Sequence, residues 1–165
     1  MNILSKFFSK KPDEDRIRET KLIRKHFSFL FEQGFSIIHA EPAQHFNNWL
    51  LDLKSTSVSV QFAEDRSELL IRIGPSQAGT GWSGTDLWDL QVLVFHLTKD
   101  TDSIPQHFFT REIEEAARIF HSHTTQIFDI FRNTNYETLT SELRKSQGAL
   151  MRKWEPEIFR GGWIG

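Results

Sequence analysis

The stretch NNWLLDLKSTSVSVQFAEDRSELLIRIGP, residues 47–75, decides the fold. Apolar and polar residues alternate in three runs of this stretch, at residues 49–54, 57–62 and 69–73. A period of two is typical of a strand that buries one face. Only short polar segments separate the runs, and strands joined in this way pair antiparallel. We therefore expect three consecutive antiparallel strands.

The apolar faces also predict the register of these strands, because antiparallel partners on one face have residue numbers with a constant sum. Neither of the two connecting turns has the Asn-Gly or Asp-Gly pair that would indicate its type. Matching the apolar residues gives two pairings: Phe62 with Leu69 across a turn at residues 65–66, and Leu53 with Val58 across a turn at residues 55–56.

The segment before these strands predicts a helix and one further strand. Between residues 13 and 33 the apolar residues recur at intervals of three and four, and acidic residues lie in the first turn, where the helix dipole favours them. Gly34 lies where a left-handed residue would end this helix, and Phe35 is placed for the accompanying hydrophobic contact. Residues 35–39 alternate again, with Phe35, Ile37 and His39 on one side. The expected sheet is thus a four-stranded meander.

The rest of the chain predicts helices. Their expected ranges are Thr85 to Leu97, Thr110 to Phe131, and Tyr136 to Trp154. Thr85 can act as the N-cap of the first, although residues 92–95 would also suit a strand. A helix, a meander and then several helices is the order of an α+β protein. We expect the last three helices to pack on one face of the antiparallel sheet.

Length and composition favour one domain with a conventional core. The chain has 165 residues, and its 38% apolar fraction includes fifteen Phe and five Trp. It has no Cys, which excludes disulfides, thiolate metal sites and a Cys nucleophile, and which fits the cytoplasm. No stretch approaches the ~20 apolar residues of a membrane span. We expect a single domain over residues 1–165, with a basic arm at 1–11 and a tail at 156–165.

The net charge of −2 is unevenly distributed along the chain. Residues 1–25 carry eight Lys/Arg against four Asp/Glu, whereas residues 26–100 carry four against nine. No concentrated basic face is indicated, which argues against a nucleic-acid partner. The arm at residues 1–11 has its apolar residues on one helical face between lysines, a pattern that suits an anionic membrane surface. Packing against the first helix, or disorder, is the simpler interpretation.

The most enzyme-like pattern is Gly79-Thr80-Gly81-Trp82-Ser83-Gly84, which matches G-x-G-x-x-G. A dinucleotide site needs this motif in a tight turn directly after a strand of a parallel βαβ unit. Here residues 75–78 intervene, the expected strands are antiparallel, and the bulky Trp82 lies inside the motif. No Lys-Ser/Thr pair follows the glycines, so a P-loop is excluded as well. We interpret the segment as a flexible connection without a cofactor.

The remaining chemistry-bearing residues also favour ordinary structural roles. None of the seven His residues forms an i, i+4 pair on an expected helix, so no metal site is predicted, although distant segments could still assemble one. His123 lies beside an apolar stripe, which suggests a partly buried, hydrogen-bonded ring. The pairs Glu64-Asp65 and Glu114-Glu115 are expected to be solvated rather than an acid/base couple. No catalytic residue is predicted, and the sequence favours a protein that is not an enzyme.

Tryptophans outside the core pattern are the candidates for partner binding. Trp82 lies in the glycine-rich connection and Trp163 in the C-terminal tail, where no periodicity demands a buried position. Large aromatics on such segments are the residues that anchor interfaces. The alternative is that both fold back onto the core. Acidic residues flank the first group, and the candidate set is therefore Trp82, Asp86, Trp88, Asp89 and Trp163.

The helix that ends in Gly-Phe, in FLFEQGFSIIHAE at residues 29–41, leads into the meander quoted above. Over residues 27–75 this pattern resembles small uncharacterised bacterial α+β proteins, some of which are immunity proteins that accompany polymorphic toxins. The resemblance carries over no catalytic or binding motif. It implies a protein that binds and blocks a toxin, and the acidic segment at residues 26–100 would suit a basic enzyme as the partner.

Three functional hypotheses follow. The first is a non-enzymatic interaction protein, of the immunity type, that uses the loop from Gly79 to Asp89. The second is a small-molecule binder or a hydrolase-like enzyme with a pocket between the sheet and the helices. The third is a peripheral membrane protein that associates through residues 1–11.

Overall fold

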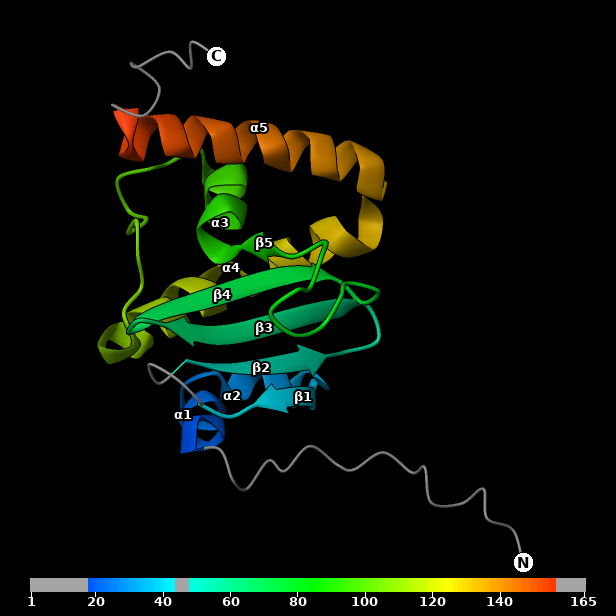
Figure 1. The fold of residues 1–165 in the computed structure, drawn as a ribbon. Helices are drawn as coiled ribbons and strands as arrows, with labels where there is room; N and C mark the ends of the chain where they lie inside the picture. Colours follow the sequence, from blue (N-terminus) through cyan, green and yellow to red (C-terminus); the bar gives the residue numbers. More distant parts are fainter. Residues whose placement is uncertain (1–17, 44–47, 157–165) are drawn as a thin grey trace, which may run out of the picture.

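The computed structural model describes residues 18–43 and 48–156, and within them it contains one antiparallel sheet of five strands (Figure 1). The strands follow one another in the sheet in chain order: β1 (Ser36–Glu41), β2 (Trp49–Lys54), β3 (Val58–Asp65), β4 (Glu68–Pro75) and β5 (Trp88–Asp89). The α+β class and the antiparallel meander are confirmed. The prediction of four strands was wrong by one, because the two residues of β5 lie where the first late helix was expected.

The helices flank the sheet as α1 (Arg18–His26), α2 (Ser28–Glu32), α3 (Leu90–Thr98), a 3-10 turn η3 (Thr110–Glu112), α4 (Ile113–Asn133) and α5 (Tyr136–Trp154). The predicted first helix is interrupted at Phe27, which has φ −117° and is fully buried. Its ring centroid lies 4.6 Å from that of Phe62 in β3. Burial of the Phe27 ring against the sheet thus accompanies the break. The part of this prediction at residues 13–17 lies outside the described residues.

The helices do not all cover the same face of the sheet. The long helix α4 packs across β3 and β4, whereas α3 stands at the β5 edge and α5 packs against α3 (Figure 1). The expectation that three late helices would share one face is therefore only partly correct. The reason is that the short strand β5 is the last strand of the sheet and leads directly into α3. Helix α3 therefore begins at the edge of the sheet.

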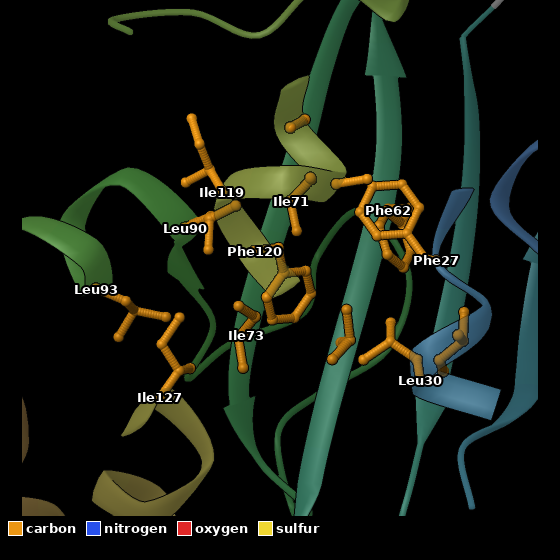
Figure 2. Close-up of a cluster of buried hydrophobic side chains, with 14 of the residues drawn as sticks. Phe27, Leu30, Phe62, Ile71, Ile73, Leu90, Leu93, Ile119, Phe120 and Ile127 are labelled. Carbon is orange, nitrogen blue, oxygen red and sulfur yellow. The ribbon is translucent and has the colours of Figure 1, made fainter. Parts of the chain in front are cut away.

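The core lies between the sheet and the helices α1, α2, α3 and α4. Figure 2 shows Phe27, Phe62 and Phe120 meeting there, beside Ile71 and Ile73 of β4. All five side chains are at most 1% exposed. Alternate residues of β2, β3 and β4 supply this buried face, as the period of two predicts.

Both hairpin registers differ from the predicted ones by two residues. Phe62 pairs with Ile71 rather than Leu69, and Leu53 pairs with Val60 rather than Val58. The turn between β3 and β4 consists of Arg66 and Ser67, whose φ angles of 52° and 71° are both left-handed, as in a type I′ turn. The Asn48 side chain clamps this turn: it accepts from the Arg66 N–H at 3.1 Å and donates to Asp65 at 3.0 Å. A shift of two keeps every side chain on its predicted face.

A bulge in β1 changes one predicted face. Ile37 pairs with Leu53, but His39 pairs with Asp52, so Ile38 is an extra residue with 41% exposure. Such a bulge reverses the alternation beyond it. His39 therefore lies on the outer face of the sheet, opposite the face on which Ile37 lies, whereas the sequence placed the two together.

The sequence predicted some of the helix ends correctly and others wrongly. Gly34 follows α2 with φ +86°, and the Phe35 N–H donates to the Leu30 carbonyl at 3.1 Å. Both features are expected of a helix whose C-terminus ends in glycine. Residues 92–95 are helical. The expected N-cap at Thr85 is wrong, because α3 begins only at Leu90, after β5.

The structure does not test the predicted terminal segments. The arm at residues 1–11 lies outside the described residues, as does the tail at 156–165 except for Pro156. Among the residues that the structure does describe, no helix is both long and apolar enough to cross a membrane.

Candidate functional site

One polar side chain from each of the five strands lies in a row across the outer face of the sheet. Successive members are direct cross-strand partners: His39, Asp52, Gln61, Arg72 and Asp89. Their chain neighbours in β2, β3 and β4 point into the core, so the pleat directs the row away from it. Asp52 and Gln61 are nevertheless only 4% and 1% exposed. Something other than the helices must cover them.

The cover is the glycine-rich loop, residues 76–87, which connects β4 to β5 and crosses the outer face (Figure 1). The Gly81 N–H donates to Asp52 Oδ2 at 2.7 Å, and Gln61 Nε2 donates to the Gly81 carbonyl at 2.9 Å. Gln61 Nε2 also donates to Asp52 Oδ1 at 2.9 Å. Both backbone groups of Gly81 are thus held by two buried side chains of the sheet.

The backbone conformation and the close packing at this crossing favour glycine. Gly81 has φ +74°, a conformation that disfavours residues with a Cβ. A Cβ there would lie 3.1 Å from the Glu41 carboxylate, which in turn bonds the His39 ring at 2.8 Å. Within the loop, the Gly79 N–H donates to the Thr85 carbonyl at 3.1 Å. The glycines therefore serve close packing, and the loop is tied to the sheet and to itself.

The row is electrostatically coupled from β2 to β5. Burial raises the pKa of Asp52 above its ordinary value, and the hydrogen bonds from Gly81 and Gln61 only partly oppose this effect. At the other end, the Arg72 guanidinium contacts Asp89 at 3.4 Å and Gln61 Oε1 at 3.4 Å. Burial raises the pKa of Asp89, although the Arg72 guanidinium acts against this rise. The Asp89 side chain keeps 49% exposure, so we expect solvent to limit its shift.

We expect Asp52→Asn to change how stability depends on pH. The folded carboxyl holds its proton more tightly than the unfolded one, so the wild-type free energy of unfolding falls as the pH rises from the ordinary aspartate pKa through the raised folded pKa. The amide introduced by the substitution does not titrate. The stability of wild type minus that of the variant should therefore decrease with pH across this window and stay level above it. Urea denaturation of both proteins from about pH 3.5 to 7 measures the difference, and a difference that increases with pH contradicts the expectation.

A groove adjoins the loop where it meets the first half of α5. Two adjoining cavities of about 670 and 280 Å³ share the side chains of Asp86, Tyr136, Thr140 and Arg144. The Tyr136 hydroxyl donates to Asp86 Oδ1 at 3.1 Å, which ties the end of the loop to the start of α5. Burial raises the pKa of Tyr136, partly offset by the neighbouring side chains of Trp88 and Thr140. We take this groove and the loop beside it as the candidate functional site.

The structure brings three of the five predicted residues to this groove. Asp86, Trp88 and Asp89 all line its smaller cavity. Trp82 lies on the loop directly after Gly81 and is 43% exposed, so it does not fold back onto the core. Trp88 is half-buried and packs against the core, which leaves it less available to a partner than the sequence suggested. Trp163 lies outside the described residues.

Several site residues were missed by the sequence analysis. Asp52 and Gln61 occupy positions at which an alternating strand normally presents polar groups to water, so their burial gave no signal. Tyr136 was taken as part of the pattern of the last helix, and Arg144 was not singled out. Glu64 was expected to be solvated, but it accepts from the Trp49 indole at 2.7 Å. All of these roles depend on segments that are distant in the chain.

Hydrogen bonds from the polar row hold the glycine-rich loop against the sheet. Within the polar row, Gln61 donates to Asp52 and to the Gly81 carbonyl, Arg72 donates to Gln61, and Asp52 accepts from the Gly81 N–H. In residues 18–43 and 48–156, no group of three or more His, Asp or Glu side chains is placed to hold a metal ion. His123 bonds the Ile119 carbonyl at 2.9 Å, which confirms the predicted hydrogen-bonded ring. What the arrangement does physically is hold the loop in one place.

Comparisons with known proteins give no family. A scan against protein-family models finds no match, and neither does a search of curated proteins or of solved structures.

Proposed function

We propose that this chain is a non-enzymatic binding protein whose partner is another protein, and that it acts as an immunity protein against a bacterial toxin. In this proposal the glycine-rich loop is the contact surface and Trp82 is its anchor. The absence of Cys fits a cytoplasmic location, in which such a protein would meet its target. The structural features of the loop support the proposal.

The observation that carries it is an exposed indole next to a fixed backbone. Gly81 is held through both its N–H and its carbonyl, by Asp52 and Gln61, and Trp82 follows it directly with 43% exposure. A large aromatic side chain on a preorganised backbone loses little entropy when a partner covers it. Trp is also enriched among the residues that dominate binding energy. A loop fixed in this way has the properties of a binding anchor.

Charge supports a basic partner. Residues 26–100, which include the whole sheet and the loop, carry nine acidic side chains against four basic ones. Near Trp82, Glu41 lies close to Gly81, and Asp86 lies at the far end of the loop. Complementary charge around an aromatic anchor speeds association and selects partners more than it adds affinity. A nucleic-acid-degrading toxin, which needs a basic surface to bind its substrate, has the required charge.

Affinity capture with Trp82→Ala tests this proposal. Tagged wild-type protein is incubated with a lysate of the source cell, and the captured protein is identified, purified and titrated against each variant. We expect Trp82→Ala to weaken binding about thirtyfold, as for a hot-spot residue worth about 2 kcal/mol. Phe109→Ala is the matched control, because Phe109 is a similarly exposed aromatic (38%) remote from the loop, beside Arg111.

Several results would count against the proposal. Equal affinity of wild type and Trp82→Ala would remove Trp82 as the anchor, even if the partner is genuine. A captured partner that is acidic, or no partner above an untagged control, would overturn the immunity function itself. Binding that falls equally in Trp82→Ala and Phe109→Ala would also remove Trp82 as a specific anchor.

A further inference from the structure

A third cavity lies where the β5 edge of the sheet meets the second half of α5, and it shares Asp89 and Gln147 with the smaller cavity of the groove. Its volume is about 260 Å³. Strands β4 and β5, helix α3, residues 106–107 and the α5 residues from Gln147 onward form its walls. In Figure 1 these elements meet where α3 stands between the sheet and the C-terminal half of α5. A pocket between sheet and helices is the feature that the small-molecule hypothesis required.

One side of this cavity is apolar. Leu150 and Val92 are buried, at 1% and 4% exposure, and form part of the apolar lining with Leu70. Met151, with 41% exposure, and the half-buried Trp154 are the parts of this wall that reach solvent. An adaptable thioether and an indole are well suited to cover a compact hydrocarbon or aromatic body.

The polar side of the cavity is acidic. Glu68, Asp89 and Glu155 come from three different elements, and no Lys or Arg is among the described residues that line the cavity. Each of these carboxylates bonds a neighbouring side chain through one oxygen: Glu68 Oε1 with His107 at 2.7 Å, Asp89 Oδ1 with Arg72 at 3.4 Å, and Glu155 Oε1 with Gln106 at 3.4 Å. A carboxylate accepts through both oxygens, so each keeps acceptor capacity for a ligand.

Two further features favour a positive charge in this cavity. Burial is the main cause that raises the pKa of Asp89, Arg72 opposes this rise, and repulsion from the Glu68 carboxylate adds a smaller rise. The cavity also adjoins the last turn of α5, which ends at Trp154, and the carbonyl groups at a helix C-terminus carry partial negative charge. A cation between the carboxylates would relieve their repulsion. Among these three carboxylates, Arg72 contacts Asp89 and the His107 ring bonds Glu68.

We propose that this cavity binds a small organic cation, in which an amidinium, guanidinium or primary ammonium group is joined to a compact apolar body. The charged group would lie between Glu155, Glu68 and Asp89, and the apolar body against Leu150, Met151 and Trp154. The volume lies just below the usual range of about 300–1,000 Å³ for ligand pockets, which excludes a nucleotide or a larger cofactor. The cavity shares Asp89 with the groove, but the inference uses neither Trp82 nor the loop at residues 76–87, so it does not depend on the proposed protein partner.

Titration calorimetry of the full chain with benzamidine tests the inference, with benzyl alcohol and benzoate as neutral and anionic probes of similar shape. We expect benzamidine to bind with a dissociation constant of up to about 10 mM. The other two probes should bind at least about tenfold more weakly. Glu155→Gln should weaken benzamidine binding about tenfold, the size expected from loss of one charge-assisted hydrogen bond. Glu142→Gln is the matched control, because Glu142 is an exposed carboxylate of α5 outside this cavity.

A second variant tests the position of the ligand without removing a charge. Met151→Trp enlarges a rim side chain that is already 41% exposed, so it should fold and should obstruct the cavity. We expect it to abolish benzamidine binding with an unchanged thermal midpoint. Equal binding of benzamidine and benzoate would overturn the inference, as would unchanged affinity in both Glu155→Gln and Met151→Trp. Absence of benzamidine binding at about 10 mM would overturn it as well.

Discussion

We expect Phe120→Ala to lower the free energy of unfolding by about 3–5 kcal/mol, the range for removing a buried aromatic ring. Phe120 is fully buried at the centre of the cluster in Figure 2. Its ring meets those of Phe29 and Phe128 edge-to-face, with centroids 5.6 and 6.1 Å away, and lies 6.3 Å from Phe27. The substitution removes three ring contacts and leaves a cavity between α4 and the sheet.

Urea denaturation followed by far-ultraviolet circular dichroism measures this loss. Phe109→Ala is again the control, since it removes the same atoms from a ring that is 38% exposed. Surface substitutions usually change stability by no more than about 0.5 kcal/mol. If Phe120→Ala and Phe109→Ala destabilised the protein equally, the core would not be centred on α4 and the sheet.

Gly74→Ala is the second substitution with a large expected effect, of about 3 kcal/mol of destabilisation at the upper end of the overpacking range. A Cβ on Gly74 would lie 2.1 Å from the carbonyl oxygen of Asp86, which is a backbone atom and cannot rotate away. Either β4 or the end of the loop must move. Because Asp86 also holds the Tyr136 hydroxyl at 3.1 Å, the movement should open the groove against α5.

The control for this substitution has the opposite expected sign. Gly148 lies inside α5, and its nearest neighbour to an added Cβ is the flexible end of Arg152 at 3.5 Å. Gly148→Ala should therefore stabilise the protein by about 0.5–1 kcal/mol, through helix propensity and a less flexible unfolded chain. Thermal and urea denaturation of both variants give the comparison. Equal effects of the two substitutions would mean that the loop does not pack closely on β4.

The sheet illustrates how far a sequence pattern reaches. Alternation in residues 49–73 correctly predicted which side chains of β2, β3 and β4 face the core. It predicted the pairing of Phe62 wrongly by two residues, because matching apolar faces is satisfied equally well by registers that differ by an even number. The choice between them was made by the left-handed turn at residues 66–67 and by the Asn48 clamp.

The candidate site was only partly predictable for a related reason. The sequence pointed to Trp82 and Asp86, since an aromatic and an acid stand outside any core periodicity there. It could not indicate that Asp52 and Gln61 are buried, because their positions in the strands look solvent-facing. It also could not indicate the groove, because Tyr136 lies 50 residues from Asp86 in the chain.

The sequence by itself thus determined the α+β class and the buried face of the meander, because both follow from periodicity within single strands and helices. It also marked Trp82 as a residue without a core position. Only the tertiary structure decided what the glycine-rich loop does, because its fixation depends on contacts from Gly81 to Asp52 and Gln61, 29 and 20 residues away. Such contacts form only when the β-hairpins have paired and their outer face can receive the loop.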